Sequence, residues 1–558
     1  MSSIIKKTVH GNQYYYAREC QRVNGKPKIV WQKYLGRADD IIAKLAQVEA
    51  PIPQEGDVIE FGLTAALYDV ASRLDLVGII DRHSPKRGQG MSVGEYMLLA
   101  TINRCSEPRS KNRIAEWYQA TALRRLMPTK PSALSSQRFW YHMDLLDAQK
   151  IREIERELAE TLAAQEGIDL SCLLYDTTNF FTYIDSRNKC SIPQRGHNKQ
   201  KRDDLKQIGL ALLVSRDSHV PLFHDVYAGN INDSTEFASV TEALIQRYDD
   251  FAKHCKDITV VFDKGNNSEA NIAGCKALHY VGSLVPSHHS DLLSIPLDEY
   301  QELPTGYKVY LTSKKVFGAE HTICLAFSQE FFESQMRGLT QQLAKRTKQL
   351  DALVARLEER RKGAIKRGRK PTVASVQRCA ARIIKGHHVE EIVKLVVADE
   401  GGDVVLGYTV DKEAISRIAT LCFGKNILFT DREDMDAASI VDTYHAQYKI
   451  EDAFKQMKDP HHVSFSPVYH WTDQKIRVHA FYCVLALTLS SLLNRQLHKA
   501  GMPISLEEMH RQLSEIKELT LTYAANGGKP KSVTMIAKMK KTQSKLFKVL
   551  NLQQFTQT

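Results

Sequence analysis

Two apolar strands that run directly into an aspartate place the strongest constraint on the fold of this 558-residue chain. Residues 173–175 (LLY) precede Asp176, and the segment DITVVFD ends at Asp263. A carboxylate at the end of a buried strand is costly to desolvate unless a cation pairs with it. A βαβ crossover places such strands side by side, and ligands of open α/β sheets bind beyond the carboxyl ends of the strands. The sequence therefore predicts an α/β fold with both aspartates at one sheet edge, facing a cation.

A third carboxylate, Glu451, lies in a segment with helical periodicity, DAASIVDTYHAQYKIEDAFKQMKD. At 3.6 residues per turn one side of this helix is apolar, formed by Ala446, Ile450, Ala453 and Met457. Glu451 lies on the opposite side, with tyrosines in the turns before it and lysines in the turns after it. One interpretation is a solvated surface in which Glu451 pairs with Lys455 four residues later.

The alternative interpretation combines Glu451 with the two aspartates. Three carboxylates without His or Cys form an oxygen-ligand set that suits Mg²⁺. A pair of such ions activates a nucleophile and stabilises the leaving oxygen in phosphoryl transfer. Lysines and tyrosines beside the glutamate would then donate to phosphate oxygens. On this hypothesis, the cation that Asp176 requires is a metal ion.

The length of the chain indicates two to four domains, because it exceeds what one hydrophobic core serves. Changes of period and charge divide it into six segments. These are a basic β-hairpin region with an Asn24-Gly25 turn (1–50), a helical, candidate DNA-binding domain (51–165), the first part of a catalytic core (166–289), a β-rich insertion with a long helical segment (290–425), the second part of the core with the Glu451 helix (426–500), and a basic helical C-terminal tail (501–558).

Charge and cysteine usage narrow the class of protein. Seven of the eleven residues in 360–370 are basic, and residues 529–558 contain seven lysines and no acid. Polyanions bind such runs, although solvated surface is an equally good explanation of either one. The ten cysteines form no C-x-x-C pair, which indicates reduced thiols. The longest apolar stretch, 480–493, is too short to span a bilayer, so we expect a core helix and no membrane partner.

The residues around Glu451 also follow a known signature. Tyr444, Gln447, Glu451 and Lys458 match the spacing Tyr-x2-Arg-x3-Glu-x6-Lys, except that Gln447 replaces the arginine. The stretches LLYDTTNF, GHNKQKRDDL, AGNINDSTEF, VVFDKGNNS and SPVYHWTDQKIRVHAFYCVLALTLSSLL follow in the expected order. In these features the chain resembles the DDE transposases of bacterial insertion sequences. The resemblance implies a ribonuclease H-like mixed-sheet α/β domain interrupted by a β-strand insertion.

The resemblance also assigns roles to individual residues. It implies that Asp176, Asp263 and Glu451 are the catalytic residues and metal ligands. It places DNA contacts on the helix, where Gln447 would contact phosphate more weakly than arginine, and Lys449 or Lys455 is the candidate to compensate. The expected DNA-binding residues are Tyr444, Gln447, Lys455, Lys458 and Lys264. Asn230 and Asp233 either support the site or are, respectively, a turn residue and a helix N-cap.

The implied function is that of a DNA transposase that binds the terminal inverted repeats of its insertion sequence. It would carry out metal-dependent phosphodiester cleavage and strand transfer with Mg²⁺, or Mn²⁺ as a substitute, and two ions are expected. The expected partners are double-stranded DNA, at element ends and target site, and a second copy of the chain in a homodimer. The expected location is the bacterial cytoplasm, at the nucleoid when DNA is bound. Two alternatives remain: a structure-selective metal-dependent DNA nuclease, and a DNA-binding protein whose catalytic core has decayed.

Overall fold

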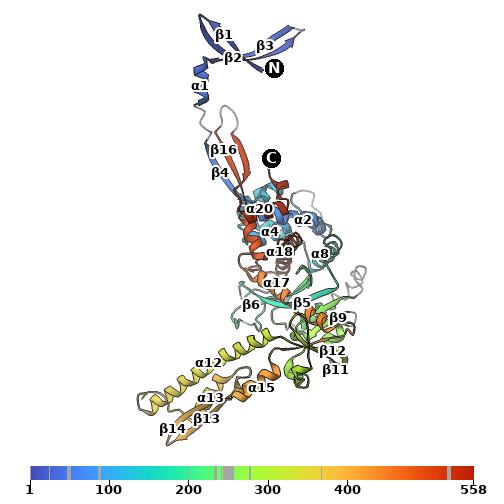
Figure 1. The fold of residues 1–558 in the computed structure, drawn as a ribbon, viewed down its shortest axis with the longest axis vertical. Coiled ribbons are helices and arrows are strands. Elements are labelled where there is room, and N and C mark those ends of the chain that lie inside the picture. The colour runs from blue at the N-terminus through green and yellow to red at the C-terminus, as the bar shows by residue number, and fades with distance from the viewer. Residues whose placement is uncertain are drawn as a thin grey trace. The chain divides into compact units, whose positions relative to one another are not determined.

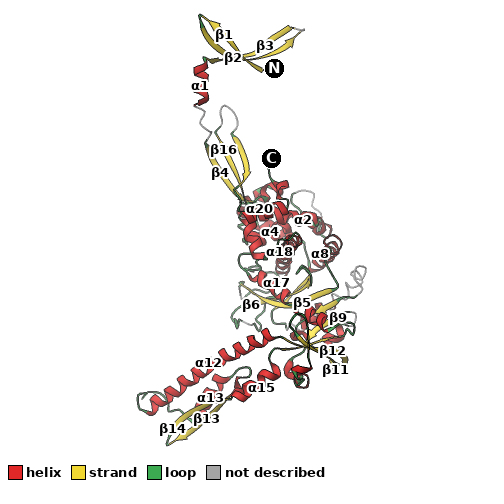
Figure 2. Ribbon diagram, viewed as in Figure 1, coloured by secondary structure: helices red, strands yellow, loops and turns green. Residues whose placement is uncertain are grey.

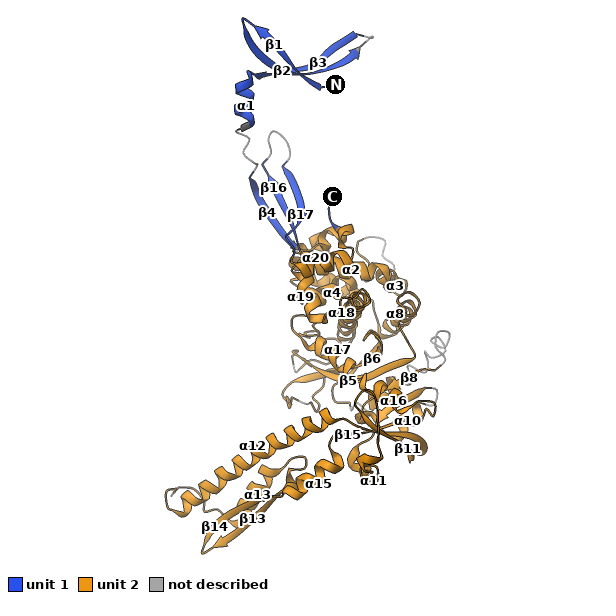
Figure 3. Ribbon diagram, viewed as in Figure 1, with its two compact units in different colours: residues 1–59, 517–539, 556–558 blue, residues 60–516, 540–555 orange. Residues whose placement is uncertain are grey.

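A computed structural model of the chain describes residues 2–23, 26–46, 52–85, 90–185, 187–198, 200–231, 235–240, 242, 257–275, 278–365, 367–524 and 530–557. The chain forms two compact units (Figure 3). Unit 1 contains residues 1–59, 517–539 and 556–558, and unit 2 contains residues 60–516 and 540–555. The segment expected to be a C-terminal tail is therefore divided between the two units.

Unit 1 is built from two small antiparallel sheets. The first has the order β1-β2-β3, from β1 (Ser2–Val9), β2 (Asn12–Val23) and β3 (Lys26–Gly36), and helix α1 (Ala38–Ala46) follows it. The predicted Asn24-Gly25 turn lies outside the described residues. The second sheet has the order β17-β16-β4, from β4 (Pro53–Glu60), β16 (Lys517–Tyr523) and β17 (Lys531–Ile536). The helical interpretation of the tail missed β16 and β17, whose Thr and Val residues favour strands.

Unit 2 is organised around one mixed sheet of nine strands, in the order β10-β11-β12-β15-β9-β8-β5-β6-β7 (Figure 1). Strand β5 runs parallel to β8 and β8 parallel to β9, whereas the other described pairs are antiparallel. The predicted mixed α/β architecture is thus confirmed. The strands are β5 (Cys172–Thr182), β6 (Lys206–Ser215), β7 (Pro221–Ala228), β8 (Thr259–Val261), β9 (His279–Ser283), β10 (Gln301–Glu302), β11 (Lys308–Val316), β12 (Ala319–Phe327) and β15 (Lys425–Thr430).

A bundle of helices packs against one end of this sheet (Figure 2). Its centre is α18 (Asp473–Lys499), which contacts α2, α4, α7, α8 and β7. By length and composition α18 could cross a membrane, but 94% of its most apolar window is buried inside the protein, as in a core helix. The other helices are α2 (Gly62–Arg73), α3 (Leu76–Arg82), α4 (Val93–Ser106), α5 (Ile114–Gln119), α6 (Leu123–Leu126), α7 (Ser136–Asp144), α8 (Ala148–Thr161), α19 (Leu506–Ser514) and α20 (Lys541–Val549).

The segment between β12 and β15 leaves the sheet and returns to it at the same point. The backbone N–H of Ser328 donates to the carbonyl of Gly424 at 2.9 Å. Between these residues lie α12 (Gln329–Arg361), α13 (Val373–Ile384), α14 (Val389–Ile392), the hairpin β13 (Val393–Glu400) and β14 (Asp403–Val410), and α15 (Lys412–Cys422), which share their own apolar core. The expected insertion of 290–425 is therefore too long, because β11 and β12 belong to the main sheet. We call residues 328–424 the inserted segment.

Candidate active site

Asp176 and Asp263 occupy equivalent positions on neighbouring parallel strands. The last residues that pair between β5 and β8 are Leu174 and Val261, and each aspartate follows two residues later. The expectation that the first strand ends at Asp176 is wrong, since β5 continues to Thr182 and pairs with β6 over this length. Its Thr and Phe residues favour an extended backbone. The site edge is thus formed by the end of β8 beside a strand that continues.

The carboxylate of Asp263 is held in one orientation by three donors. Its Oδ1 accepts from the backbone N–H of Lys264 at 2.7 Å and from Ser283 Oγ at 3.3 Å, and it lies 3.2 Å from the Tyr444 hydroxyl. Ser283 is the last residue of β9, the strand next to β8. The sequence analysis did not single out Ser283, although its place at a strand end beside Asp263 is the same kind of signal.

The predicted helix that carries Tyr444 and Glu451 is divided in two. Tyr444 lies in the last turn of α16 (Ala437–His445), and Glu451 lies in the first turn of α17 (Tyr448–Lys458). The break contains tight bonds from residue i to i−3: Gln447 N–H donates to the Tyr444 carbonyl at 3.0 Å, and Ile450 N–H to the Gln447 carbonyl at 3.2 Å. The residues predicted to form the apolar side, 446, 450, 453 and 457, are buried.

Tyr444 connects this helix pair to Asp263. Its hydroxyl lies 2.8 Å from Ser283 Oγ as well as 3.2 Å from Asp263 Oδ1, so one proton serves both acceptors. Burial of the phenol, then the negative charge of Asp263, raises the pKa of Tyr444, and the charge of Glu451 adds to the rise. Both carboxylates therefore act on the same half-buried tyrosine hydroxyl.

Helix α17 is fixed to β5 on both sides of Asp176. The Gln447 amide donates to the carbonyl of Tyr175 at 3.3 Å, and Lys458 Nζ donates to Thr178 Oγ1. At 100° per residue, positions 447, 451 and 458 lie within about 40° of one another around a helix. Glu451 therefore lies on the face of α17 that is turned toward Asp176.

The environment of Glu451 differs from the first interpretation, in which Glu451 forms a surface ion pair with Lys455. Glu451 is exposed, and the described residues contain no ion pair between it and Lys455. The carboxylates are nevertheless not gathered into a closed cluster: within the described ranges, no three His, Cys, Asp or Glu side chains lie close enough to hold a metal ion. The arrangement brings together Asp176 and Asp263 by register. Tyr444 contacts Asp263, whereas Glu451 acts on the Tyr444 hydroxyl by its charge alone.

The remaining candidate residues lie around this centre. Lys455 is exposed on α17, and Asn230 is exposed in the turn after β7. Asp233 lies outside the described residues. Lys264 is exposed beside Asp263 and lines a pocket of 440 Å³, whose other wall includes Phe331 and His387 of the inserted segment. Thr178, which receives the bond from Lys458, was not recognised as a site residue from the sequence.

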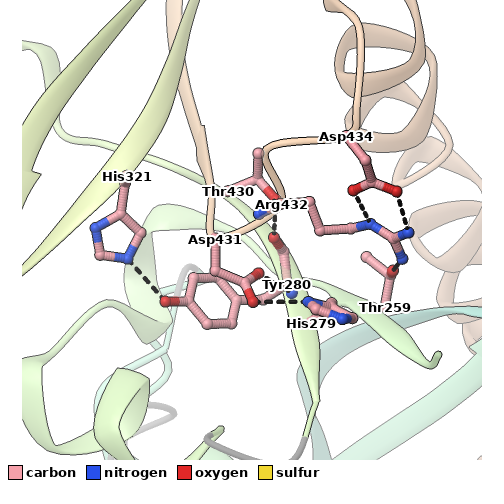
Figure 4. Close-up of polar contacts among 8 residues, drawn as sticks. All are labelled: Thr259, His279, Tyr280, His321, Thr430, Asp431, Arg432 and Asp434. Atoms are coloured by element: carbon pink, nitrogen blue, oxygen red, sulfur yellow. Dashed lines mark hydrogen bonds and ion pairs between the residues drawn. The ribbon is translucent and has the colours of Figure 1, made fainter.

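A polar network at the opposite end of β8 and β9 fixes the chain as it returns from the inserted segment (Figure 4). Asp431, just after β15, accepts from the Tyr280 backbone N–H at 2.9 Å and lies 2.8 Å from His279 Nδ1. The next residue, Arg432, donates to Thr259 Oγ1 at 3.3 Å and pairs with Asp434. Helix α16 starts at Ala437, three residues after Asp434, and carries Tyr444 in its last turn, so the network lies just before the start of α16.

The chain matches a known protein family and is distantly similar to a solved structure. The family model described as "Transposase DDE domain" matches residues 184–489, a stretch that includes Asp263, Tyr444 and Glu451 and begins after Asp176. A solved structure, the piggyBac transposase synaptic complex with hairpin DNA, is similar with a TM-score of 0.35 and 8% identity, over 81% of this chain and 78% of that chain. This likeness is too distant to bear on the site. No curated protein matches the chain. Because the family match covers more than half of its 558 residues, the chain belongs to the transposase DDE domain family.

Proposed function

We propose that this protein is the transposase of a bacterial insertion sequence, which binds the terminal inverted repeats, cleaves a phosphodiester and transfers the freed 3′ end to target DNA. The observation that supports the proposal is the placement of Asp176 and Asp263 at matching positions on neighbouring parallel strands, with Tyr444 in contact with Asp263 and the start of α17 bonded to β5 beside Asp176. The order β7-β6-β5-β8-β9, with β5, β8 and β9 parallel, supports a ribonuclease H-like catalytic domain.

The donor set fits a hard divalent cation, because its three members are carboxylates and neither His nor Cys is among them. Asp176, Asp263 and Glu451 would hold the metal. Mg²⁺, or Mn²⁺ in its place, with two ions as the expected number, would activate water and stabilise the leaving oxygen. The hydrogen bonds of Asp263 support this role, since they fix the carboxylate before an ion arrives.

The cationic and amide side chains around the carboxylates would position the DNA. Lys458 is held beside Thr178, two residues from Asp176, where its ammonium can reach a phosphate next to the reacting one. Lys264, next to Asp263 in the chain, and Lys455, four residues after Glu451, are exposed and would track neighbouring phosphates. Gln447 and Tyr444 would act mainly by holding α17 and Asp263 in place. Double-stranded DNA is the proposed partner, in the cytoplasm or at the nucleoid.

The test is an assay with labelled DNA carrying both ends of the element, run with the purified chain in Mg²⁺, Mn²⁺, Ca²⁺ and EDTA. We expect cleavage and strand transfer with Mg²⁺ or Mn²⁺, and a complex with two chains per pair of ends in light scattering. Cleavage without transfer would instead indicate a nuclease, and binding without cleavage a decayed enzyme. Full cleavage in EDTA would overturn the metal assignment.

A further inference from the structure

We propose that a cationic pocket within the helical bundle of unit 2, remote from the three carboxylates, is a binding site for a phosphate group. The pocket has a volume of 180 Å³, and its polar wall includes Arg104, Arg109, Lys111, His470, His479 and Tyr482. These residues come from α4, the segment after it, the loop before α18, and α18 itself. None of the described residues that line the pocket is acidic.

Two cations of this pocket, Arg104 and Lys111, are buried, and the ion pairs of the described residues give neither of them an acidic partner. Arg104 is 3% exposed, and its Nε is buried with no hydrogen-bond partner in the described structure. Lys111 is 7% exposed, and its ammonium lies 4.3 Å from the centre of the Tyr482 ring. Arg109 pairs with Glu107 at the rim, and the nearby Lys475 pairs with Asp144, so these two acids are already engaged. The Arg104 guanidinium donates to the Arg109 carbonyl and to Asn103 Oδ1, which are neutral acceptors. A buried cation without a counter-charge is costly, and a bound anion would reduce that cost.

The lowered pKa values of groups in the pocket also indicate a site for an anion. Burial, together with the positive charges of Lys111, Arg104 and Lys475, lowers the pKa of His470 to about 3. Burial and the neighbouring cations likewise lower the pKa values of Lys111 and His479 far below their ordinary ranges. Burial without an anion therefore disfavours the charged forms of these groups. An anion would favour their charged forms, so its binding should be accompanied by proton uptake.

The position of the pocket favours DNA as the source of the phosphate. Thr182 of β5 forms a bridge with Val468, and Tyr183 N–H donates to the Val468 carbonyl at 3.1 Å, next to the lining residue Tyr469. Thr182 is six residues from Asp176 on the same strand, or roughly 20 Å at about 3.3 Å per residue. A duplex covers this distance in about six base pairs.

The rim of the pocket adds surface that suits nucleic acid. Tyr469 is 60% exposed and lies 6.4 Å, between ring centres, from the exposed Tyr183. Exposed aromatic rings beside a cationic pocket provide stacking surfaces for bases, as in proteins that bind single strands. The phosphate chemistry stands without the proposed transposase function, whereas DNA as its source rests on that function.

The test uses the full chain and two variants. Lys111→Met keeps a long apolar stem against Tyr482 and removes the charge, and Arg113→Gln is the control because Arg113 is exposed and pairs with Glu116 outside the pocket. Inorganic phosphate is titrated at constant ionic strength. We expect a saturable rise in the melting temperature of the wild type and of Arg113→Gln, with proton uptake in calorimetry. Lys111→Met should melt higher without phosphate and lose the response. An unchanged phosphate response in Lys111→Met would overturn the proposal.

A second measurement separates the two sources of phosphate. Duplexes with one neutral methylphosphonate at successive positions are compared for binding to wild type and Lys111→Met. If DNA supplies the phosphate, a substitution about six nucleotides from the cleaved bond should weaken wild-type binding and leave Lys111→Met unaffected. A response to inorganic phosphate without such a position would support the pocket with a free anion as its ligand. Asp263→Asn should keep the phosphate response, so a failure of the transposase proposal would remain distinguishable.

Discussion

The hydroxyl of Tyr444 lies 3.2 Å from the Asp263 carboxylate, although 181 residues separate the two in the chain. Asp263 follows a strand that precedes the inserted segment, and Tyr444 lies in the last turn of the first helix after that segment. Their contact therefore joins the two parts of the catalytic domain at the site itself. Whatever displaces α16 also displaces the support of one proposed metal ligand.

Neutralising any of the three carboxylates should abolish catalysis. We expect Asp176→Asn, Asp263→Asn and Glu451→Gln each to reduce DNA cleavage by on the order of 10³-fold or more, because losing one ligand misplaces the nucleophile. Binding to end DNA should persist, since positive charge elsewhere supplies most of the affinity. Nicking assays and gel shifts measure the two effects. Asp452→Asn, on the next residue of α17, is the control. A Glu451→Gln enzyme that still nicks DNA would show that Glu451 is a surface residue and not a metal ligand.

Removing the Tyr444 hydroxyl should weaken the site without destroying it. Tyr444→Phe deletes the contacts with Asp263 and Ser283 and keeps the half-buried ring. A hydrogen bond of this kind contributes about 1 kcal/mol, which corresponds to roughly a fivefold change. We expect half-maximal cleavage to require several-fold more Mg²⁺. The exposed Tyr448 provides the control Tyr448→Phe, and equal metal dependence in both variants would show that Tyr444 does not support Asp263.

Restoring the arginine of the family signature should strengthen DNA binding. Gln447 is half-buried and bonds to the Tyr175 carbonyl, a contact that a guanidinium can also make. Gln447→Arg should therefore fold normally and gain one phosphate contact. The slope of log affinity against log salt should steepen by about 0.9. Gln456→Arg, at the other end of the same helix, is the comparison. If both variants steepen the slope equally, the added charge acts from a distance.

The stability of unit 2 should depend on the protonation of Glu236. Burial and the nearby charge of Asp225 raise the pKa of Glu236 to about 7, from a usual 4.5, and its Oε1 is buried without a hydrogen-bond partner. The folded protein thus holds this proton more tightly than the unfolded chain. Its stability should decline as the pH rises from about 4.5 to 7 and remain lower above that range.

Glu236→Gln removes the charge and tests this dependence. We expect the variant to gain about 1–3 kcal/mol in the free energy of unfolding at pH 8, and much less at pH 5, by chemical denaturation. Glu269→Gln, at the exposed start of α10 (Glu269–Gly274), should have little effect at either pH. A gain for Glu236→Gln that is the same at both values would show that packing, not charge, causes it.

The sequence predicted those parts of the site that depend on local pattern. An apolar run followed by aspartate predicted that Asp176 and Asp263 lie on neighbouring strands, and the two follow the β5–β8 pairing at matching positions because parallel strands share their direction. It could not show that β5 continues beyond Asp176, since pairing with β6 decides this. A strand ends where its pairing with a neighbouring strand ends, and the sequence of one segment does not show which strand is its neighbour.

Features that depend on tertiary contacts could not be predicted from the sequence. The division between α16 and α17 contains neither Gly nor Pro, so nothing local marks it, and the contacts of Tyr444 and Gln447 hold the two helices in place. Strands β11 and β12 were assigned to the insertion because their order in the sheet depends on β15, which lies about a hundred residues later. Ser283 becomes a site residue through its distance to Asp263 alone.

The two ends of the inserted segment meet where the Ser328 N–H donates to the Gly424 carbonyl, and Phe327 faces Lys425 across adjacent antiparallel strands. A turn of a few residues would span this gap, so the segment behaves as a cassette: the connectivity of the sheet is the same with it or without it. Relatives can therefore lengthen, shorten or replace it without rethreading the chain. The inserted segment can therefore vary in sequence and length while the strands that carry Asp176 and Asp263 keep their order.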